Sequence, residues 1–287
     1  MSQVESIVVI GAGTMGSGIA YAAAANGISA TVVDVASAAL DKARGYHEKT
    51  AARSVEKGRL LEADAKSLLG RIAYEGDLAE ACAGSGFVIE AASERADLKK
   101  SLFATMVASA AGDAVLATNT SSISITEIAT AAGDAADRVI GMHFFNPVPV
   151  MKLVEVIKGL ATSEATVERT ISLAKAMGKT PIPANDRAGF VSNRVLMPLI
   201  NEAFFAWMEG VAKAEDIDEI MKLGCNFPMG PLRLADFIGL DVCHDIMMVL
   251  HRELGDPKFF PCPLLRQLVT AGRLGDKTGH GVYEHTR

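Results

Sequence analysis

The sequence predicts an α/β fold in which a domain with a mostly parallel sheet is followed by an all-helical domain. Three observations support this prediction. A glycine-rich turn follows the first β-branched run, strand and helix patterns alternate through the first half of the chain, and no strand pattern interrupts the helical patterns after residue 186. At 287 residues the chain is near the length, roughly 250–300 residues, at which one hydrophobic core stops growing. We therefore expect two domains, at residues 1–186 and 187–287.

The composition is that of an ordinary globular protein, with 49% hydrophobic and 22% charged residues. The apolar runs are far shorter than the ~20 residues that cross a bilayer, so no membrane span is expected. The net charge of −6 provides no general attraction to nucleic acid. The first residues lack the pattern of a signal peptide, which favours a cytoplasmic protein. The four cysteines are Cys82, Cys225, Cys243 and Cys262. They are widely spaced and form no Cys-x-x-Cys pair, so we expect buried free thiols and neither a metal site nor a disulfide.

The first strand and helix enclose a glycine-rich turn. Residues 6–10 form a β-branched run typical of a buried strand, and residues 17–25 have a helical pattern. Between them, Gly11 suits a tight turn, Gly13 lets backbone amides approach a pyrophosphate, and Gly16 allows close packing of helix and strand. This order predicts a Rossmann-type dinucleotide site, with the phosphates at the positive end of the helix. Its expected contacts are Gly11, Gly13, Thr14, Met15 and Gly16.

A carboxylate ends the second predicted strand. That strand covers residues 28–34, and Asp34 stands 18 residues after Gly16. A carboxylate at this place can bind both hydroxyls of an adenosine ribose and would repel a 2′-phosphate. The sequence therefore predicts NAD rather than NADP as the cofactor.

Further strands are predicted at residues 86–92, 114–118 and 138–143, with helices at 97–110 and 124–131. Alternating strands and helices of this length specify a parallel sheet with right-handed crossovers. Ligands of such sheets bind beyond the carboxyl ends of the strands, so polar residues at these ends are candidates for a site.

The candidates at these strand ends are Glu94, Lys99 and the stretch Asn119-Thr-Ser-Ser122. Asn, Thr and Ser commonly make local turn and helix-capping hydrogen bonds, so a helix cap is one interpretation of this stretch. The other interpretation is that one of its hydroxyl groups binds a reacting oxygen.

The stretch from Gly141 to Glu155 contains two titratable groups on either side of two prolines. His143 is a candidate for proton transfer and Glu155 for its orientation. Pro147 and Pro149 fix φ and lack a backbone donor, so we expect an extended, stiff chain between them. The alternative is that His143 is a core histidine and that Glu155 ends an edge strand.

Residues 37–69 have a helical pattern with many charges, which Gly58 is expected to interrupt. Lys57 stands beside this break. Mixed charges usually mark a solvated helix face. The functional alternative is that Lys57 meets the phosphates of a bulky anionic substrate.

After the polar residues 185–187, helices are predicted at 189–210, 213–223 and 235–254. Their apolar side chains exceed what about 100 residues of single-domain core would hide. Plain core and a two-fold interface are both open interpretations. The side chains concerned are Met197, Phe204, Phe205, Trp207, Met247 and Met248.

Six motifs together make the chain resemble the L-3-hydroxyacyl-CoA dehydrogenase family, and most closely its short bacterial members, the 3-hydroxybutyryl-CoA dehydrogenases. The resemblance covers essentially the whole chain. It implies an NAD-dependent oxidoreductase that interconverts (S)-3-hydroxyacyl-CoA and 3-ketoacyl-CoA, a coenzyme A thioester as substrate, and a homodimer formed through the helical domain. The motifs are the glycine-rich turn, Asn119-Thr-Ser-Ser122, His143-Phe-Phe-Asn-Pro-Val-Pro149, Leu153-Val-Glu-Val156, Gly189-Phe-Val-Ser-Asn-Arg194 and Lys277-Thr-Gly-His-Gly281.

The resemblance also implies roles for single residues. It places the catalytic pair on His143 and Glu155, and the contacts with the substrate oxygen on Ser121 and Asn193. Its cofactor contacts fall on Asp34, Glu94, Lys99, Asn146 and Lys277, and a coenzyme A contact on Lys57. Two local departures stand out. The segment between Ser122 and His143 is about one residue longer than is common, so counting back from His143 favours Ser122 over Ser121. Ala188 replaces a proline that is frequent before Gly189.

The expected chemistry explains these residue types. Oxidation of a secondary alcohol removes its hydroxyl proton as hydride leaves the same carbon, and an imidazole suits this proton transfer. An anionic Glu155 would fix the tautomer of His143 and stabilise the imidazolium. Ser121 and Asn193 would polarise the reacting oxygen. The alternatives are a β-hydroxyacid dehydrogenase for a small carboxylate, in which a lysine is the usual base, and a non-catalytic dinucleotide-binding relative.

Overall fold

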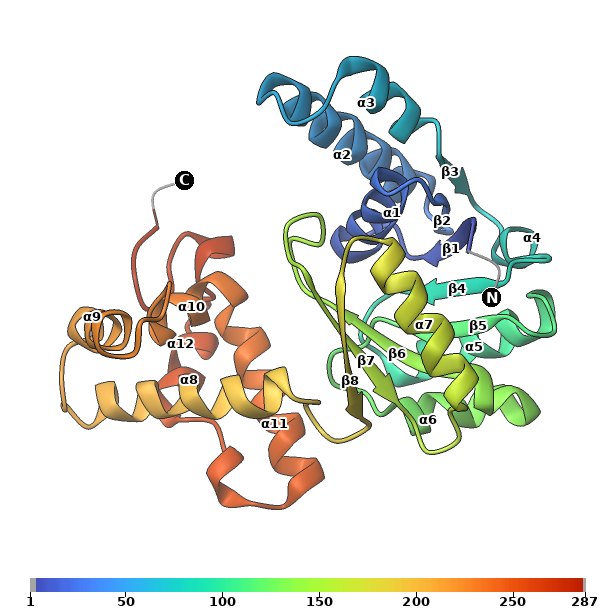
Figure 1. Cartoon of the computed structure of the whole chain (residues 1–287). Helices are drawn as coiled ribbons and strands as arrows, with labels where there is room; N and C mark the ends of the chain where they lie inside the picture. The colour runs from blue at the N-terminus through green and yellow to red at the C-terminus, as the bar shows by residue number, and fades with distance from the viewer. Residues whose placement is uncertain (1–3, 286–287) are drawn as a thin grey trace. The chain divides into compact units, whose positions relative to one another are not determined.

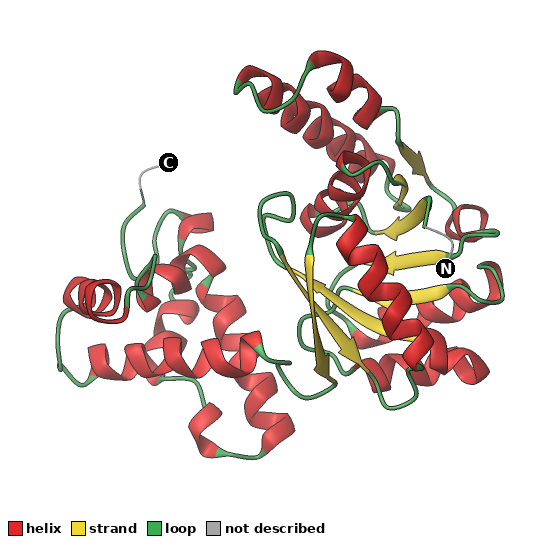
Figure 2. Ribbon diagram, in the orientation of Figure 1, coloured by secondary structure: helices red, strands yellow, loops and turns green. Residues whose placement is uncertain are grey.

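The computed structural model describes residues 4–285. The chain divides into two compact units, Met1–Asp186 and Arg187–Arg287. Figure 1 follows the chain through both units, and Figure 2 shows that the strands belong to the first unit while the second consists of helices and loops. Within residues 4–285, no helix combines the length and the apolar character that crossing a bilayer requires.

The first unit is built on an eight-stranded sheet with the order β3-β2-β1-β4-β5-β6-β7-β8. Strands β1 to β6 run parallel, β7 pairs antiparallel with β6, and β8 pairs parallel with β7. The carboxyl ends of β1 to β6 therefore share one edge of the sheet with the amino end of β7. The strands are β1 (Ser6–Ile10), β2 (Ser29–Val33), β3 (Ile72–Glu75), β4 (Phe87–Glu90), β5 (Val115–Thr118), β6 (Val139–Phe144), β7 (Leu153–Lys158) and β8 (Thr180–Asn185).

Helices connect and cover these strands. The apolar sides of α1 and α7 pack with strand residues in one core cluster, to which Ile19 and Leu173 belong. Phe103 of α5 and Ile128 of α6 are also fully buried. The helices of this unit are α1 (Thr14–Ala25), α2 (Ser37–Glu56), α3 (Glu62–Leu69), α4 (Leu78–Cys82), α5 (Ala96–Ser109), α6 (Ile125–Ala129), the 3-10 helix η1 (Thr130–Arg138) and α7 (Glu164–Ala176).

The predicted strands and helices of residues 6–143 are confirmed, with ends that differ by a few residues. Gly58, at φ 65°, separates α2 from α3 as expected. The sequence did not reveal β8, because Pro181 and Pro183 disfavour a strand. These prolines are tolerated because β8 lies at the edge of the sheet, where a missing backbone donor can face solvent.

The expectation of an extended chain between His143 and Glu155 is wrong. After β6 the chain turns, and the backbone N–H groups of Val150 and Met151 both donate to the carbonyl oxygen of Pro147. Strand β7 then returns antiparallel to β6. The prolines thus occupy a turn, where a fixed φ and a missing donor are equally acceptable.

The second unit is helical, but the predicted helix at 235–254 is two helices. They meet at Gly239, whose φ of 106° interrupts helical geometry. The helix after Cys262 was not predicted. The helices are α8 (Ser192–Met208), α9 (Ala214–Cys225), α10 (Pro231–Ile238), α11 (Leu240–Leu254), α12 (Pro263–Thr270) and the 3-10 helices η2 (Pro257–Phe259) and η3 (Asp276–Thr278).

The apolar residues singled out in this unit divide between core and surface. Met197, Phe204 and Met247 are buried in its core, and Phe205 and Trp207 pack partly buried against it. Met197, Phe204 and Met247 are therefore plain core, and of the six only Met248 is exposed. The predicted two-fold interface stays a prediction. Cysteine burial was also predicted too broadly: Cys82, Cys243 and Cys262 are buried free thiols, but Cys225 is exposed.

Candidate active site

The glycine-rich turn leaves its helix N-terminus open. Gly11 has a φ of 102°, and a Cβ atom on Gly16 would lie 1.8 Å from the carbonyl oxygen of Gly11, so both positions exclude side chains. A Cβ atom on Gly13 would meet nothing within 4 Å. Gly13 is the N-cap of α1 and has no side chain with which to cap it. No side chain of the N-cap therefore occupies the amides of the first turn, and their contact with a pyrophosphate stays a prediction.

The Asp34 carboxylate is held directly beside this turn. Its Oδ2 accepts a hydrogen bond from the backbone N–H of Ala12 at 3.0 Å, and its Oδ1 accepts one from Ala36 at 3.0 Å. Asp34 follows the last residue of β2, and β2 is the parallel neighbour of β1. The carboxylate therefore lies at the expected sheet edge, and its contact with a ribose stays a prediction.

His143 and Glu155 are directly opposite each other in the antiparallel pair β6 and β7. Nδ1 of His143 lies 2.7 Å from Oε2 of Glu155, and the two residues are only 7% and 3% exposed. The imidazole also packs on the Phe145 ring, with 4.7 Å between centroids. The structure thus brings together the two predicted partners in a desolvated setting, and it does so through strand pairing, not through a stiff tether.

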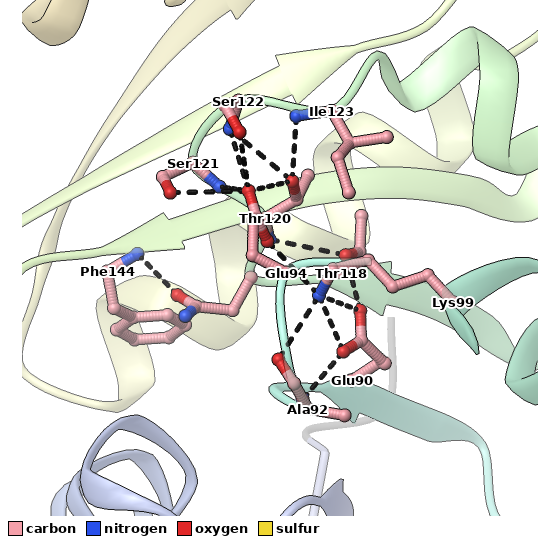
Figure 3. A network of polar contacts seen from close by, with 11 residues as sticks. Glu90, Ala92, Glu94, Lys99, Thr118, Thr120, Ser121, Ser122, Ile123 and Phe144 are labelled. Carbon is pink, nitrogen blue, oxygen red and sulfur yellow. Dashed lines mark hydrogen bonds and ion pairs between the residues drawn. The ribbon is translucent and has the colours of Figure 1, made fainter. Parts of the chain in front are cut away.

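The loop after β5 is organised by two side-chain oxygens (Figure 3). Oδ1 of Asn119 accepts a hydrogen bond from the backbone N–H of Phe144 at 2.9 Å, which ties this loop to the end of β6. Oε1 of Glu94 accepts hydrogen bonds from the backbone N–H groups of Ser121 and Ser122, each at 2.9 Å. It also accepts one from the Thr120 hydroxyl at 2.7 Å.

Both candidate serines share this partner. The hydroxyl of Ser121 lies 3.3 Å from Oε1 of Glu94, and that of Ser122 lies 3.0 Å from it. The local motif therefore serves as a polar turn around Glu94, and the choice of Ser121 for the substrate oxygen stays a prediction. None of the four residues from Asn119 to Ser122 caps α6, whose N-cap is Ser124, but Thr120 makes the expected local turn bond by accepting from the backbone N–H of Ile123 at 3.0 Å.

Lys99 lies inside the protein. Its side chain is 1% exposed, and Nζ lies 2.7 and 2.9 Å from the two carboxylate oxygens of Glu90 and 3.5 Å from Oε2 of Glu94. Burial alone would raise the pKa of Glu94. The positive charge of Lys99 and the hydrogen bonds from the loop outweigh burial and hold this pKa below its ordinary value, so Glu94 is anionic near neutral pH.

The remaining predicted contacts are spread over both units. Lys57 is exposed at the C-terminus of α2, and Asn146 is exposed in the turn after β6. Asn193 is largely buried in the first turn of α8, and Lys277 of η3 forms an ion pair with Asp241 at 2.5 Å; both belong to the second unit. Their contacts with cofactor or substrate, like that of Lys99, stay predictions.

Sequence reasoning missed Glu90, which is the main partner of Lys99. It is the last residue of the fully buried strand β4. One signal was present, because a glutamate inside the apolar run of residues 86–92 requires a buried cation or several donors. Its partner could not be found from spacing, since Lys99 is on the following helix.

Comparison with known proteins identifies the family of both units. Residues 6–187 match the family model described as 3-hydroxyacyl-CoA dehydrogenase, NAD binding domain, and residues 189–285 match the C-terminal domain of the same family.

A probable 3-hydroxybutyryl-CoA dehydrogenase of Bacillus subtilis is 53% identical over 99% of this chain and 98% of its own length. A 3-hydroxybutyryl-CoA dehydrogenase of Clostridioides difficile is 45% identical, over 98% and 99%. The crystal structure of (S)-3-hydroxybutyryl-CoA dehydrogenase from Ralstonia eutropha superposes with a TM-score of 0.95 at 47% identity, covering 99% of this chain and 100% of that one. The chain belongs to the 3-hydroxyacyl-CoA dehydrogenase family.

Proposed function

We propose that the protein interconverts (S)-3-hydroxybutyryl-CoA and acetoacetyl-CoA, with His143 as the proton-transfer residue. The family is one of NAD-dependent oxidoreductases that act on 3-hydroxyacyl-CoA thioesters and their 3-keto products. The four-carbon substrate is supported by the names of the similar proteins from Bacillus subtilis and Clostridioides difficile. The observation that carries the catalytic proposal is the buried His143–Glu155 pair at the sheet edge that also bears the glycine-rich turn.

In this proposal His143 accepts the proton of the substrate hydroxyl during oxidation and returns it during reduction. The hydrogen on Nδ1 is directed at Glu155, so proton exchange takes place at Nε2. The Glu155 carboxylate fixes this tautomer and stabilises the imidazolium that forms. NAD, when bound, would accept the hydride that leaves the carbon bearing the hydroxyl group.

Other residues bind and orient. Ser121 and Asn193 are proposed to hold the reacting oxygen, and Lys57 to contact the phosphates of coenzyme A. The open amides of the glycine-rich turn fit the pyrophosphate of NAD, and Asp34 beside it fits the ribose. Glu94, Asn146 and Lys277 are the further proposed contacts of the cofactor, whereas the buried ammonium of Lys99 is engaged by Glu90 and Glu94. A homodimer formed through the helical unit, which exposes Val211, Ile220 and Leu223, also belongs to the proposal, as does a cytoplasmic location.

The test is oxidation of NADH in the presence of acetoacetyl-CoA, repeated with NADPH and with a longer 3-ketoacyl-CoA. We expect turnover with NADH and the four-carbon ester, and much less with NADPH. A strong preference for the longer ester would overturn the proposed chain length but not the reaction. Absence of turnover with every ester, despite tight binding of NADH, would overturn the proposed activity.

A further inference from the structure

Glu90 is a fully buried carboxylate in the first unit, at 0% exposure. Besides the Lys99 ammonium, it accepts hydrogen bonds from the Thr118 hydroxyl at 2.6 Å and from the backbone N–H of Ala92 at 2.6 Å. Both of its oxygens therefore have donors, and its charge is balanced by that of Lys99 (Figure 3). The carboxylate of Glu90 thus needs no further partner, and neither charge of the pair faces solvent.

Lys99 connects this buried pair to the polar loop. The two oxygens of Glu94 have different partners: Oε2 lies 3.5 Å from Nζ of Lys99, and Oε1 accepts the hydrogen bonds of Ser121 and Ser122. The ammonium thus restrains one end of a carboxylate whose other end holds the loop backbone. With 37% of its side chain exposed, Glu94 has room to move if this restraint is removed.

Fold stability alone is a poor explanation of the buried pair. Removing two charges from water costs several kcal/mol per ion, and apolar residues of the same volume often stabilise a fold equally well. The pair does, however, place a fixed cation where the Glu94 carboxylate needs one. An anion held in one orientation gives the loop one main-chain conformation, and such support is what keeps binding groups in a productive geometry.

We propose that Glu90 and Lys99 are positioning residues, which hold Glu94 and, through it, the main chain of Ser121 and Ser122 in the conformation that receives the reacting oxygen. This inference rests on the proposed function of the site. Glu90 touches neither substrate nor cofactor in this scheme. Glu90 holds Lys99, and Lys99 in turn holds Glu94.

The experiment replaces both charges together, because removal of Lys99 alone would leave a buried anion. In the double variant Glu90→Gln/Lys99→Met, the amide can still accept from Ala92 and donate to Thr118, and methionine fills most of the lysine stem. We expect a folded protein whose kcat/KM for acetoacetyl-CoA falls by about 10- to 100-fold, the usual cost of misplacing groups near a reacting centre. The matched control is Glu127→Gln/Lys100→Met, which removes the exposed pair formed by the next residue of α5. It should stay within about twofold of the wild type.

A double-mutant cycle separates positioning from a general loss of structure. The same double substitution is made in the Glu94→Gln background, where the link to the loop is already weakened. If Glu90 and Lys99 act through Glu94, the added substitutions should lower kcat/KM by less than about twofold there. Full additivity would overturn the inference, and so would a double variant that equals the wild type in the native background.

Two further measurements keep the test decisive. Circular dichroism and the melting temperature show whether the double variant folds. If it does not fold, Glu90→Gln/Lys99→Gln serves, since it also removes both charges while the two amides can hydrogen bond to each other; unchanged kcat/KM in that variant would overturn the inference. Activity of the wild type is measured in parallel. Its absence would count against the proposed function, whereas a normal wild type with an unaffected variant counts only against the positioning role.

Discussion

Both units of the molecule use carboxylates to fix polar segments, but the two sets have different surroundings. In the helical unit, Asp236 is 1% exposed and accepts hydrogen bonds from the backbone N–H groups of Val282 and Tyr283 at 2.8 and 2.9 Å. Asp218 likewise accepts from the backbone of Leu232, at 2.8 Å. In the sheet unit, Glu94 is partly exposed and gathers serine hydroxyls as well as main-chain groups.

This difference teaches how a structural carboxylate differs from one that serves a site. Asp236 and Asp218 satisfy buried main-chain donors: Asp236 ties the C-terminal segment to α10, and Asp218 ties the start of α10 to α9. Glu94 keeps a surface toward solvent and holds groups that can also reach a ligand. Substitutions in the first set should lower stability, and substitutions in the second set should lower activity.

The largest expected effect is at the proton-transfer residue. His143→Gln keeps a hydrogen-bonding side chain opposite Glu155 but removes the titratable nitrogen. We expect turnover to fall at least ~100-fold, with NADH binding retained. Steady-state kinetics and NADH titration by fluorescence measure the two quantities. Unchanged turnover would remove His143 from the mechanism.

The structural role of the buried aspartates in the helical unit is tested by Asp236→Asn. The amide presents a donor to backbone N–H groups that need an acceptor, which should lower the free energy of unfolding by about 2–4 kcal/mol. Urea denaturation measures this loss, and Asp245→Asn, on an exposed side chain of α11, is the control within about 0.5 kcal/mol. If Asp236→Asn reduced kcat/KM without loss of stability, the distinction between the two sets of carboxylates would fail.

Asp34 is a further test of this comparison. Its hydrogen-bond partners suggest a structural role, whereas its position suggests a role in cofactor binding. It accepts hydrogen bonds from main-chain donors, as Asp236 does, yet it lies beside the glycine-rich turn. In the functional interpretation, Asp34→Arg should raise the ratio of NADP to NAD activity by about tenfold or more, since arginine replaces a repelling charge with a partner for the 2′-phosphate. Comparison of kcat/KM for the two cofactors is the measurement. A variant that is only less stable, with the same cofactor ratio, would make Asp34 structural.

The smallest expected effect concerns a second histidine of the sheet unit. His47 is fully buried, with Nε2 donating to the carbonyl oxygen of Ser17 at 2.8 Å and Nδ1 accepting from the Tyr74 hydroxyl at 2.7 Å. Burial lowers its pKa below the ordinary 6.5, against the opposing effect of the Ser17 carbonyl. The unfolded chain therefore takes up a proton first as pH falls. The contribution of neutral His47 to the free energy of unfolding is therefore complete above pH ~6.5. Below this pH it is lost, by at most about 1.4 kcal/mol per pH unit.

Urea denaturation near pH 7.5 and pH 5.5 tests this for the wild type and His47→Gln. The wild type should lose more stability than the variant between the two pH values. Parallel losses would show that another group causes the pH dependence. Unlike His143, which faces the carboxyl group of Glu155, His47 has a hydroxyl and a backbone carbonyl as partners, so the two histidines compare a proposed site residue with a core residue.

Part of the fold and of the site could be predicted from the sequence because the signals are local. The glycine-rich turn needs its three glycines at fixed spacing, and the break at Gly58 needs only one residue with positive φ. The position of His143 near the carboxyl end of a strand was also predicted, and Glu155 was predicted as its partner. Their mutual placement was predicted for the wrong reason, because the chain between them turns back.

Features that depend on contacts between residues far apart in the sequence could not be predicted from such local signals. Strand β8 contains two prolines and exists because β7 offers it a partner. The family resemblance implied a cofactor contact for Lys99, and the structure places its ammonium in the interior against Glu90, which also accepts a hydrogen bond from Thr118 of the adjacent strand. A buried charge is decided by what surrounds it in space, and spacing along the chain does not contain that information.

The sequence by itself determined the class of the fold, the glycine-rich turn and NAD as the cofactor, and it supplied the candidate residues of the site, because these follow from short stretches with fixed backbone or side-chain demands. Only the tertiary structure decided that His143 faces Glu155 across an antiparallel strand pair and that the serine loop is held by Glu94, Lys99 and Glu90. The physical reason is that hydrogen bonds and ion pairs act over a few ångströms in space, whichever part of the chain supplies their atoms.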